Sequence, residues 1–534
     1  MTDSAASRRL WLVSAGVLLV AAVLRLWELG TPQRLVFDEI YYVRDAISQL
    51  AHGFPTDWPD DDPTFTDPAA FTDRAAPIAH PPLGKWLIGL GVVLFGAESA
   101  WGWRIASAVA GIATVALTMR LGWLMTRSLP VVAFAGLVLA LDGVHVVLSR
   151  VGLLDGFLTL LVVLGALLVW KDQASGGALR AARARAGSLS RLGPVLWRRP
   201  WLLAAGLTFG AAAAVKWSGL YPLAAFLLLI TVRDFIVRRR IAERPVLGAA
   251  RQALVTAVIA LPAALIAYLA TWIGWILHPS ASGRAPGEPW WVSLWEWHTH
   301  TLIWHASLSA DHPYRANPWS WPLALRPTGM YWHSEPEGPG CPEPAGCAAA
   351  ISALPNPLVT WGGVLALLVL AWVVARALWL AARSPALPGR RLPDVRRRSA
   401  VRRLPAPLRE PAVWIAAFVL VGYLSGWLPW VFTASRSAVF QFYAVVLTPF
   451  AALALGLVLG VLVTMPPAAS AQIVFRTTGI RIDGSAEASL GRRISVVVFA
   501  LAMLLLGLLF FPLWSAMLAP EWFWRAHLWL PGWR

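Results

Sequence analysis

Residues 10–39 read LWLVSAGVLLVAAVLRLWELGTPQRLVFDE, an apolar run that is followed by an acidic pair. The apolar part, Leu10 to Leu26, approaches the ~20 residues that a helix needs to cross a bilayer core about 30 Å thick. It follows Arg8 and Arg9, as the apolar part of a signal peptide would. No small-residue cleavage site precedes Trp27, so we interpret the run as a first membrane span.

The rest of the chain repeats this apolar pattern. Of its 534 residues, 58% are hydrophobic and 14% are charged, and the mean hydropathy is +0.61. A soluble core of this length cannot bury so much apolar surface, so the composition indicates an all-α integral membrane protein. We expect about eleven transmembrane helices. They lie near residues 10–28, 101–125, 130–148, 153–170, 201–216, 218–235, 252–277, 357–380, 412–431, 438–463 and 494–518.

The net charge of +17 is an orientation signal. A basic patch on a soluble domain would suggest nucleic acid, but basic loops between membrane spans stay on the cytoplasmic side. With the N-terminus in the cytoplasm, the inner arginines are those of residues 180–199, 238–240 and 390–409. The loops 29–86 and 278–356, where acidic residues outnumber basic ones, then lie outside with the C-terminus. We therefore expect the chemistry on the outer side.

The acidic pair Asp38 and Glu39 stands where the chain leaves the first span and begins an amphipathic stretch. Paired carboxylates at such a place are candidates for general acid or base chemistry. The alternative is a helix N-cap, because Asp and Glu favour the positive end of a helix. The pair alone does not decide between the two.

Cations stand at several outer helix ends. The motif His80-Pro81-Pro82-Leu83-Gly84-Lys85 leads into an apolar run, Arg104 follows Trp103, Lys216 lies in an apolar region, and Arg436 lies in a short turn. Each is compatible with an interfacial anchor that keeps its charge in water. As a set, these cations are candidates to bind an anionic leaving group such as a lipid phosphate.

An outer turn carries Arg150 and Asp155 within Ser149-Arg150-Val151-Gly152-Leu153-Leu154-Asp155. An ionisable residue at the start of a membrane helix is costly unless it has a partner or a task. Arg150 is the obvious partner, so a structural ion pair is the alternative to a functional role.

The second outer loop alternates aromatic residues with histidines, a composition that favours holding a peptide or a sugar. The residues are His298, His305, His312, Tyr314, Asn317 and Trp319. The spacing of the histidines and the lack of a nearby carboxylate motif argue against a metal site. Both cysteines of the chain, Cys341 and Cys347, stand in the same loop. We prefer a local disulfide to free thiols there, because the outer compartment permits one.

Together these motifs resemble the protein O-mannosyltransferase family in its bacterial, particularly actinobacterial, form. The ordered set carries the resemblance: the acidic pair, His-Pro-Pro-Leu-Gly-Lys, Trp-Arg, Arg-x-x-Leu-Leu-Asp, Ala-x-Lys-Trp-Ser-Gly, the stretch from His312 to Leu323, and Arg436 with Phe440. Lipid-A aminoarabinose transferases share single motifs of this set. Eukaryotic family members carry a lumenal trefoil-type module that this chain lacks, so acceptor selection is expected to differ.

The resemblance implies a GT-C type glycosyltransferase that moves mannose from polyprenyl-phosphate mannose to Ser/Thr hydroxyls of proteins, with inversion. Asp38 would be the general base, and Glu39 would position it or contact the peptide. Lys85, Arg104, Lys216 and Arg436 would bind the donor phosphate, supported by His80, Arg150 and Asp155. No cofactor is implied, and no nucleic acid; membrane lipids and the protein export machinery are the expected partners beside donor and acceptor.

The same interpretation predicts a plasma-membrane protein that consists of three regions. Residues 1–277 would be the catalytic membrane module, 278–356 the second outer loop, and 357–534 a four-helix membrane region. The cytoplasmic stretches 171–200 and 382–411 are interpreted as flexible connections. The alternatives are a related transferase that acts on a lipid or cell-wall glycan, and a transporter or flippase.

Overall fold

The structure is a computed structural model of the chain. It describes residues 2–59, 64–185, 192–239, 242, 244–309, 311–338, 340–383, 411–433, 436–465, 472–474, 481–483 and 485–533. Side chains are described for these residues except 2–5, 177–185, 472–474 and 481–483. The predicted arginine cluster 390–409, together with Arg191 and Arg240, lies outside the described residues.

Nine helices within the described residues are long and apolar enough to cross a membrane. They are α1 (Thr2–Leu26), α4 (Ala100–Thr126), α7 (Asp155–Arg185), α9 (Leu220–Arg238), α10 (Pro245–Ala270), α13 (Pro357–Arg383), α14 (Pro411–Phe432), α15 (Thr448–Thr464, continuing the 3-10 helix η4, Gln441–Leu447) and α16 (Ala486–Ser515). Shorter apolar helices are α3 (Leu83–Phe95), α5 (Leu129–Ala140) and α8 (Pro200–Val215). The multi-pass helical fold is therefore confirmed.

Two of the eleven predicted spans are not among these nine long helices. The predicted span 130–148 is two helices, α5 and α6 (Gly143–Leu148), because Asp142 accepts a hydrogen bond from the His145 N–H (2.8 Å) and begins a new helix. The predicted span 201–216 is α8, whose 16 residues are fewer than the ~20 that span a bilayer. In addition, α7 continues to Arg185, so the first part of the stretch 171–200 is helix and not a flexible connection.

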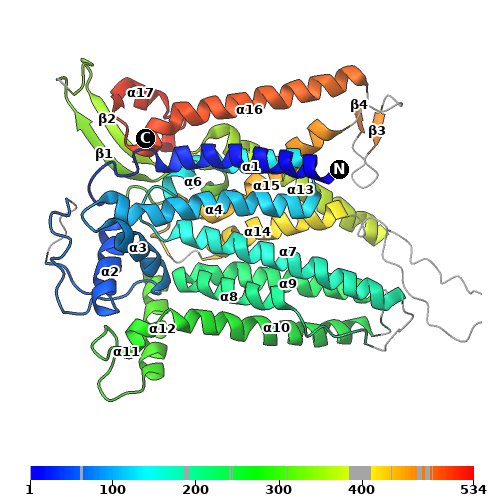
Figure 1. Cartoon of the computed structure of the whole chain (residues 1–534), viewed down its shortest axis with the longest axis horizontal. Helices are drawn as coiled ribbons and strands as arrows, with labels where there is room; N and C mark the ends of the chain where they lie inside the picture. Colours follow the sequence, from blue (N-terminus) through cyan, green and yellow to red (C-terminus); the bar gives the residue numbers. More distant parts are fainter. Residues whose placement is uncertain are drawn as a thin grey trace, which may run out of the picture.

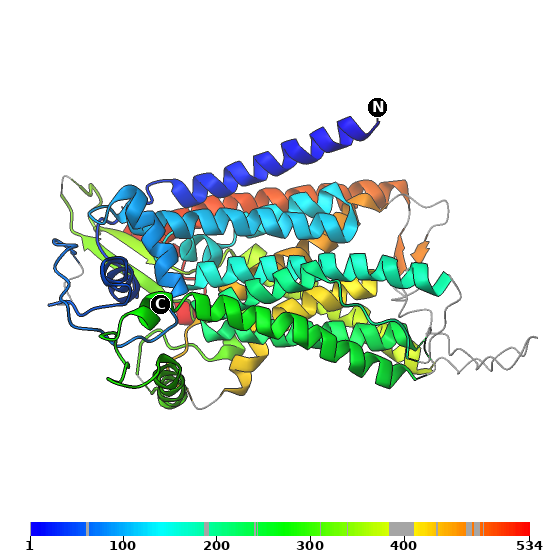
Figure 2. The ribbon, with the colours of Figure 1, turned by 60° about the horizontal axis from the view of Figure 1, so that its bottom comes forward.

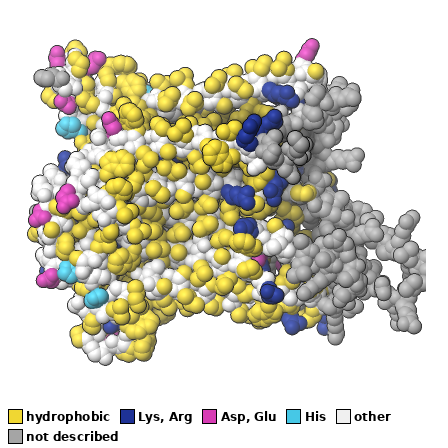
Figure 3. Space-filling model, in the orientation of Figure 1, with side chains coloured by type: hydrophobic (Ala, Val, Ile, Leu, Met, Phe, Trp, Pro, Cys, Tyr) yellow, Lys and Arg dark blue, Asp and Glu magenta, His cyan; other side chains and the backbone are white. Residues whose placement is uncertain are grey.

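The long helices run side by side in one bundle (Figure 1). Small residues permit close packing within it: a Cβ on Gly210 of α8 would lie 2.1 Å from the carbonyl oxygen of Ala264 in α10. In the view of Figure 3, Lys and Arg side chains gather near the end of the bundle that holds the N-terminus, and Asp, Glu and His gather at the opposite end. This asymmetry is the one that the sequence predicts.

The end of the bundle opposite the N-terminus carries the remaining elements (Figure 1). These are α2 (Glu39–His52), α11 (Ile273–Leu277), α12 (Trp290–Ser307), α17 (Glu521–Ala526), and the 3-10 helices η1 (Trp217–Gly219), η2 (Pro318–Leu323) and η5 (Pro531–Trp533). Figure 2 shows α2 and α12 end-on, so both lie across the bundle axis. Exposed Trp291, Trp295 and Trp304 on α12 are typical of a helix at a membrane interface.

A small antiparallel sheet stands at the same end, with β2 (Cys347–Ser352) between β1 (Gly329–Glu335) and β5 (Ala519–Pro520). The second outer loop and the C-terminal region, predicted as separate parts, thus share one sheet. A second pair of strands, β3 (Gln472–Val474) and β4 (Arg481–Asp483), lies at the N-terminal end of the bundle (Figure 1).

Candidate active site

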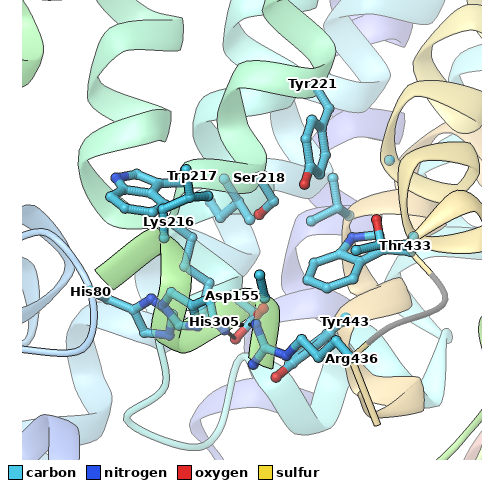
Figure 4. Close-up of a pocket in the computed structure, with 16 residues that line it drawn as sticks. His80, Asp155, Lys216, Trp217, Ser218, Tyr221, His305, Thr433, Arg436 and Tyr443 are labelled. Atoms are coloured by element: carbon cyan, nitrogen blue, oxygen red, sulfur yellow. Dashed lines mark hydrogen bonds and ion pairs between the residues drawn. The ribbon is translucent and has the colours of Figure 1, made fainter. Parts of the chain in front are cut away.

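A cavity of about 180 Å³ opens between α7, the α8–α9 junction, α12, α14 and η4. Figure 4 shows how its polar side chains converge from these elements. Its lining consists of His80, Asp155, Leu158, Lys216, Trp217, Ser218, Tyr221, Leu302, His305, Ala306, Gly426, Trp430, Thr433, Arg436, Tyr443 and Val446. Two of the four predicted phosphate-binding cations, Lys216 and Arg436, are among them.

Lys216 forms an ion pair with Asp155, with 2.8 Å between its Nζ and the carboxylate Oδ2. Lys216 has extended backbone angles (φ −148°, ψ 140°) because α8 ends at Val215, and this break places the lysine beside the first residue of α7. The prediction that Arg150 is the partner of Asp155 is corrected. Arg150 instead donates hydrogen bonds to the carbonyl oxygens of Leu24 and Glu28.

Arg436 is held by His305, whose Nδ1 lies 3.1 Å from the Arg436 Nη1. A guanidinium only donates, so Nδ1 accepts, and the Nε2–H of His305 donates to the carbonyl oxygen of Ala79 (3.0 Å). Burial, the largest cause, lowers the pKa of His305 to about 4, which keeps the ring neutral as this arrangement requires. The ring stacks on His80, whose pKa burial also lowers.

Asp38 immediately precedes α2 and makes no capping hydrogen bond with its side chain. Asp38 thus occupies the N-cap position, as the alternative interpretation has it, but its carboxylate does not cap the helix by a hydrogen bond. Burial raises the pKa of Asp38 to about 6, and among nearby charges Lys216 opposes the rise while Asp155 adds to it. These two residues of the cavity wall are thus the charges that act on Asp38.

Glu39 and Arg104 form a fully buried pair, with 2.8 Å between the Arg104 Nε and the Glu39 Oε1. Glu39 also accepts hydrogen bonds from the backbone N–H groups of Val36 and Gly152. Arg104 donates further to the carbonyl oxygens of Leu29, Pro32 and Arg34. All its donor nitrogens are engaged, so Arg104 offers no free donor to a phosphate, which corrects the predicted role.

Lys85 is likewise engaged away from the cavity. It is 1% exposed, pairs with Asp45 (3.2 Å) and donates to the carbonyl oxygen of His80 (3.1 Å). Lys85 therefore fixes the backbone that carries His80. Lys85, a candidate for binding the donor phosphate, is not among the residues that line the cavity.

The residues of the second outer loop have separate places. His298 lies 2.7 Å from the Tyr268 hydroxyl and stacks on Trp217, while His312 packs edge-on against Phe37, the residue before Asp38. Tyr314 donates its backbone N–H to the His312 ring (3.1 Å), Asn317 accepts from the N–H of Trp319 (3.1 Å), and Trp319 is 65% exposed.

Cys341 and Cys347 form a disulfide. No cluster of three or more potential metal ligands occurs within the described residues.

The sequence interpretation missed several residues of the cavity wall. Trp217 and Ser218 follow Lys216 in a motif that was noted only for its lysine. Tyr221, Trp430 and Tyr443 lie in apolar runs, where an aromatic residue that lines a cavity has the same pattern as one that faces lipid.

A second, apolar cavity of about 590 Å³ lies beside the first, between α8, α9, α10 and α12. Trp217, Tyr221 and Leu302 line both cavities, so the two are contiguous. The arrangement therefore offers a cationic end, in the first cavity, and an apolar groove that leads away from it.

Known proteins are similar to this chain in sequence. A sequence model of the family described as dolichyl-phosphate-mannose-protein mannosyltransferase matches residues 15–278, and one for the C-terminal four-transmembrane region of protein O-mannosyltransferases matches residues 290–533. The polyprenol-phosphate-mannose–protein mannosyltransferases of Mycobacterium tuberculosis and Mycolicibacterium smegmatis are 32% and 31% identical to this chain. Each alignment covers 98% of this chain, with 92% and 93% of those proteins.

A solved structure has the same fold. The S. cerevisiae protein O-mannosyltransferase Pmt1–Pmt2 complex bound to its sugar donor matches with a TM-score of 0.67 and 14% identity, over 98% of this chain and 92% of that one. The predicted GT-C type fold is thereby confirmed. The chain belongs to the protein O-mannosyltransferase family.

Proposed function

We propose that this glycosyltransferase moves a mannosyl unit from polyprenyl-phosphate mannose to Ser or Thr hydroxyls of proteins. Membership in the family supports the reaction. The structural observation that carries the assignment to a site is the convergence of Lys216 and Arg436 on one cavity, two of whose wall residues, Lys216 and Asp155, interact electrostatically with Asp38. Two cations can bind the negative charge of a phosphate leaving group, and a carboxylate can accept the proton of an acceptor hydroxyl.

In this mechanism Asp38 takes the proton of the acceptor hydroxyl. The hydroxyl oxygen bonds to the anomeric carbon while the bond from that carbon to the phosphate oxygen breaks, and polyprenyl phosphate leaves. One direct displacement inverts the anomeric centre. A pKa of about 6 makes Asp38 a stronger base than an ordinary aspartate, yet leaves it mostly ionised near neutral pH.

The leaving phosphate gains negative charge as the bond breaks, and we assign its stabilisation to Lys216 and Arg436. Arg104 and Lys85 are left out of this role because their donors are taken by Glu39, Asp45 and backbone carbonyls. Glu39 acts indirectly: its bonds to Arg104 and to two backbone N–H groups fix the start of α2, and thus Asp38. The mechanism requires no cofactor.

The apolar cavity suits the prenyl chain of the donor. It begins at Trp217, Tyr221 and Leu302, which also line the cationic cavity, and it runs between helices that are apolar on their surfaces. A lipid whose phosphate lies at Lys216 would thus find an apolar surface for its first isoprene units.

We further propose that the active site faces the outside of the plasma membrane and the N-terminus the cytoplasm. The separation of basic and acidic side chains in Figure 3 supports this orientation under the positive-inside rule. Acceptors would then arrive during or after export, which makes the export machinery the expected partner.

The experiment uses the full-length chain purified in detergent, polyprenyl-phosphate mannose labelled in the sugar, and a Ser/Thr-rich peptide. Wild type should label the peptide and Asp38→Asn should not. The matched control is Asp73→Asn, an exposed carboxylate in the same outer loop, which should retain activity. Labelling of a lipid or glycan acceptor without peptide labelling would instead identify the related transferase.

A further inference from the structure

The strand β1 is an edge strand at the same end of the bundle as the proposed active site (Figure 1). Within the described residues, β2 is the only partner that hydrogen-bonds to the β1 backbone, and β2 has β5 on its other side. Trp332, His333 and Ser334 of β1 are exposed, Trp332 to 45%. Such an edge presents N–H and C=O groups that another extended chain can pair with.

Side-chain contacts connect the beginning of β1 to Phe37, which precedes the proposed general base Asp38. A Cβ on Gly329 would lie 2.6 Å from the Tyr314 hydroxyl, so the tyrosine lies directly on the start of the strand. The Tyr314 and His312 rings are 5.9 Å apart, and His312 is 6.3 Å from the ring of Phe37, the neighbour of Asp38. The rings of Tyr314, His312 and Phe37 thus connect the start of β1 to the residue before Asp38.

Several bonds hold the edge in place. The disulfide of Cys341 and Cys347 closes the loop between β1 and β2, and Cys347 is also the first residue of β2. The Ala516 N–H donates to the carbonyl oxygen of Ala350, and the rings of Trp332 and Trp524 lie 4.4 Å apart. The strand is thus fixed before a partner binds, which lowers the entropic cost of pairing with it.

We propose that β1 binds the acceptor polypeptide as an added strand and leads its hydroxyl residue to Asp38. The proposal rests on the proposed function and names how its acceptor is held. Strand addition uses main-chain hydrogen bonds, so it accepts many sequences but requires an extended, unpaired chain. The Glu335 side chain at the end of β1 and Glu337 beyond it add negative charge, which favours neutral or basic acceptors over acidic ones.

The test scans the acceptor, so that folding of the enzyme is never in question. Each peptide carries a single Thr and otherwise residues without hydroxyls. In one series the Thr lies near the N-terminus of the peptide, and in the other it lies near the C-terminus. Each peptide has one N-methylated backbone amide, moved along the series. Neighbouring amides of a strand point to opposite edges. In one series, N-methylation at every second position beyond the cavity should raise the acceptor KM about two- to tenfold, with kcat and donor KM unchanged.

A peptide too short to reach β1 separates this proposal from the proposed function. If it is labelled and the longer peptides show no alternation, or respond equally at successive positions, β1 does not pair with the acceptor. If no peptide of any length is labelled, the proposed function fails and the inference with it. Labelling of the short peptide together with the alternating KM supports both.

Discussion

The ammonium nitrogen of Lys216 lies 2.8 Å from a carboxylate oxygen of Asp155 in the wall of the cationic cavity, and both side chains are less than a tenth exposed. The Asp155 carboxylate therefore holds the ammonium group of Lys216 in place before a donor arrives. When the phosphate binds, Lys216 can remain between two anions, with its three N–H groups shared among them.

The first prediction concerns the charge of Lys216. We expect Lys216→Met to lower kcat/KM for the donor about 100-fold or more, because it removes a preorganised cation from the leaving group. The same change leaves Asp155 buried and unpaired, which should lower stability by about 3–5 kcal/mol. Initial rates at varied donor concentration and thermal unfolding in detergent measure the two effects.

A double variant separates these effects. Lys216→Met combined with Asp155→Asn has no unpaired buried charge, so its thermal stability should return toward that of the wild type while donor use stays low. Recovery of activity in the double variant would show that Lys216 acts only through folding.

The second prediction concerns pH. A base must be ionised, and burial raises the pKa of Asp38 to about 6. Transfer should thus be fully present well above pH 6 and fall about tenfold per unit below it, whereas an ordinary aspartate would hold the rate down to about pH 4. Because the charge of Asp155 adds to the rise, Asp155→Asn should move the acid limb of kcat/KM to lower pH. An unchanged acid limb in that variant would argue against Asp38 as the titrating group.

Apolar length and charge asymmetry in the sequence predicted the helical membrane fold, because a bilayer imposes both directly. The break between α5 and α6 was missed although Asp142-Gly143 interrupts an apolar run, a signal that hydropathy averaged over a span conceals. The helix boundary at Asp142 thus depends on a capping hydrogen bond, and a hydropathy average carries no information about capping.

The candidate site was only partly predictable for a different reason. Asp38, Lys216 and Arg436 stand out as charges at helix ends, but the partner of each is set by packing between distant segments. Asp155 and Lys216 are 61 residues apart, and Glu39 and Arg104 are 65 apart. Sequence proximity favoured Arg150 for Asp155, and it gave no means of separating cations that line the cavity from those already engaged.

The third prediction concerns the hydrogen bond between Arg436 and His305. Arg436→Ala should raise the donor KM about 10-fold or more, because a charge-assisted contact to phosphate is lost. His305→Leu keeps the charge of Arg436 but removes the acceptor that holds the guanidinium, together with the hydrogen bond to Ala79, so we expect a smaller rise in the same constant. Arg315→Ala, an exposed arginine of the same outer loop, is the control and should behave as wild type. Equal donor KM values in all three variants would exclude Arg436 from phosphate binding.

The last prediction concerns Glu39 and Arg104, which are fully buried and joined by two hydrogen bonds of 2.8 Å. Loss of either partner leaves the other as an unpaired buried charge, so Glu39→Gln and Arg104→Met should each lower stability by about 3–5 kcal/mol. The folded fraction of either variant, isolated by size exclusion, should keep the donor KM of the wild type and lose mainly kcat, because the start of α2 that carries Asp38 is less well fixed. The opposite pattern in Arg104→Met, a stable protein with a raised donor KM, would return Arg104 to the phosphate.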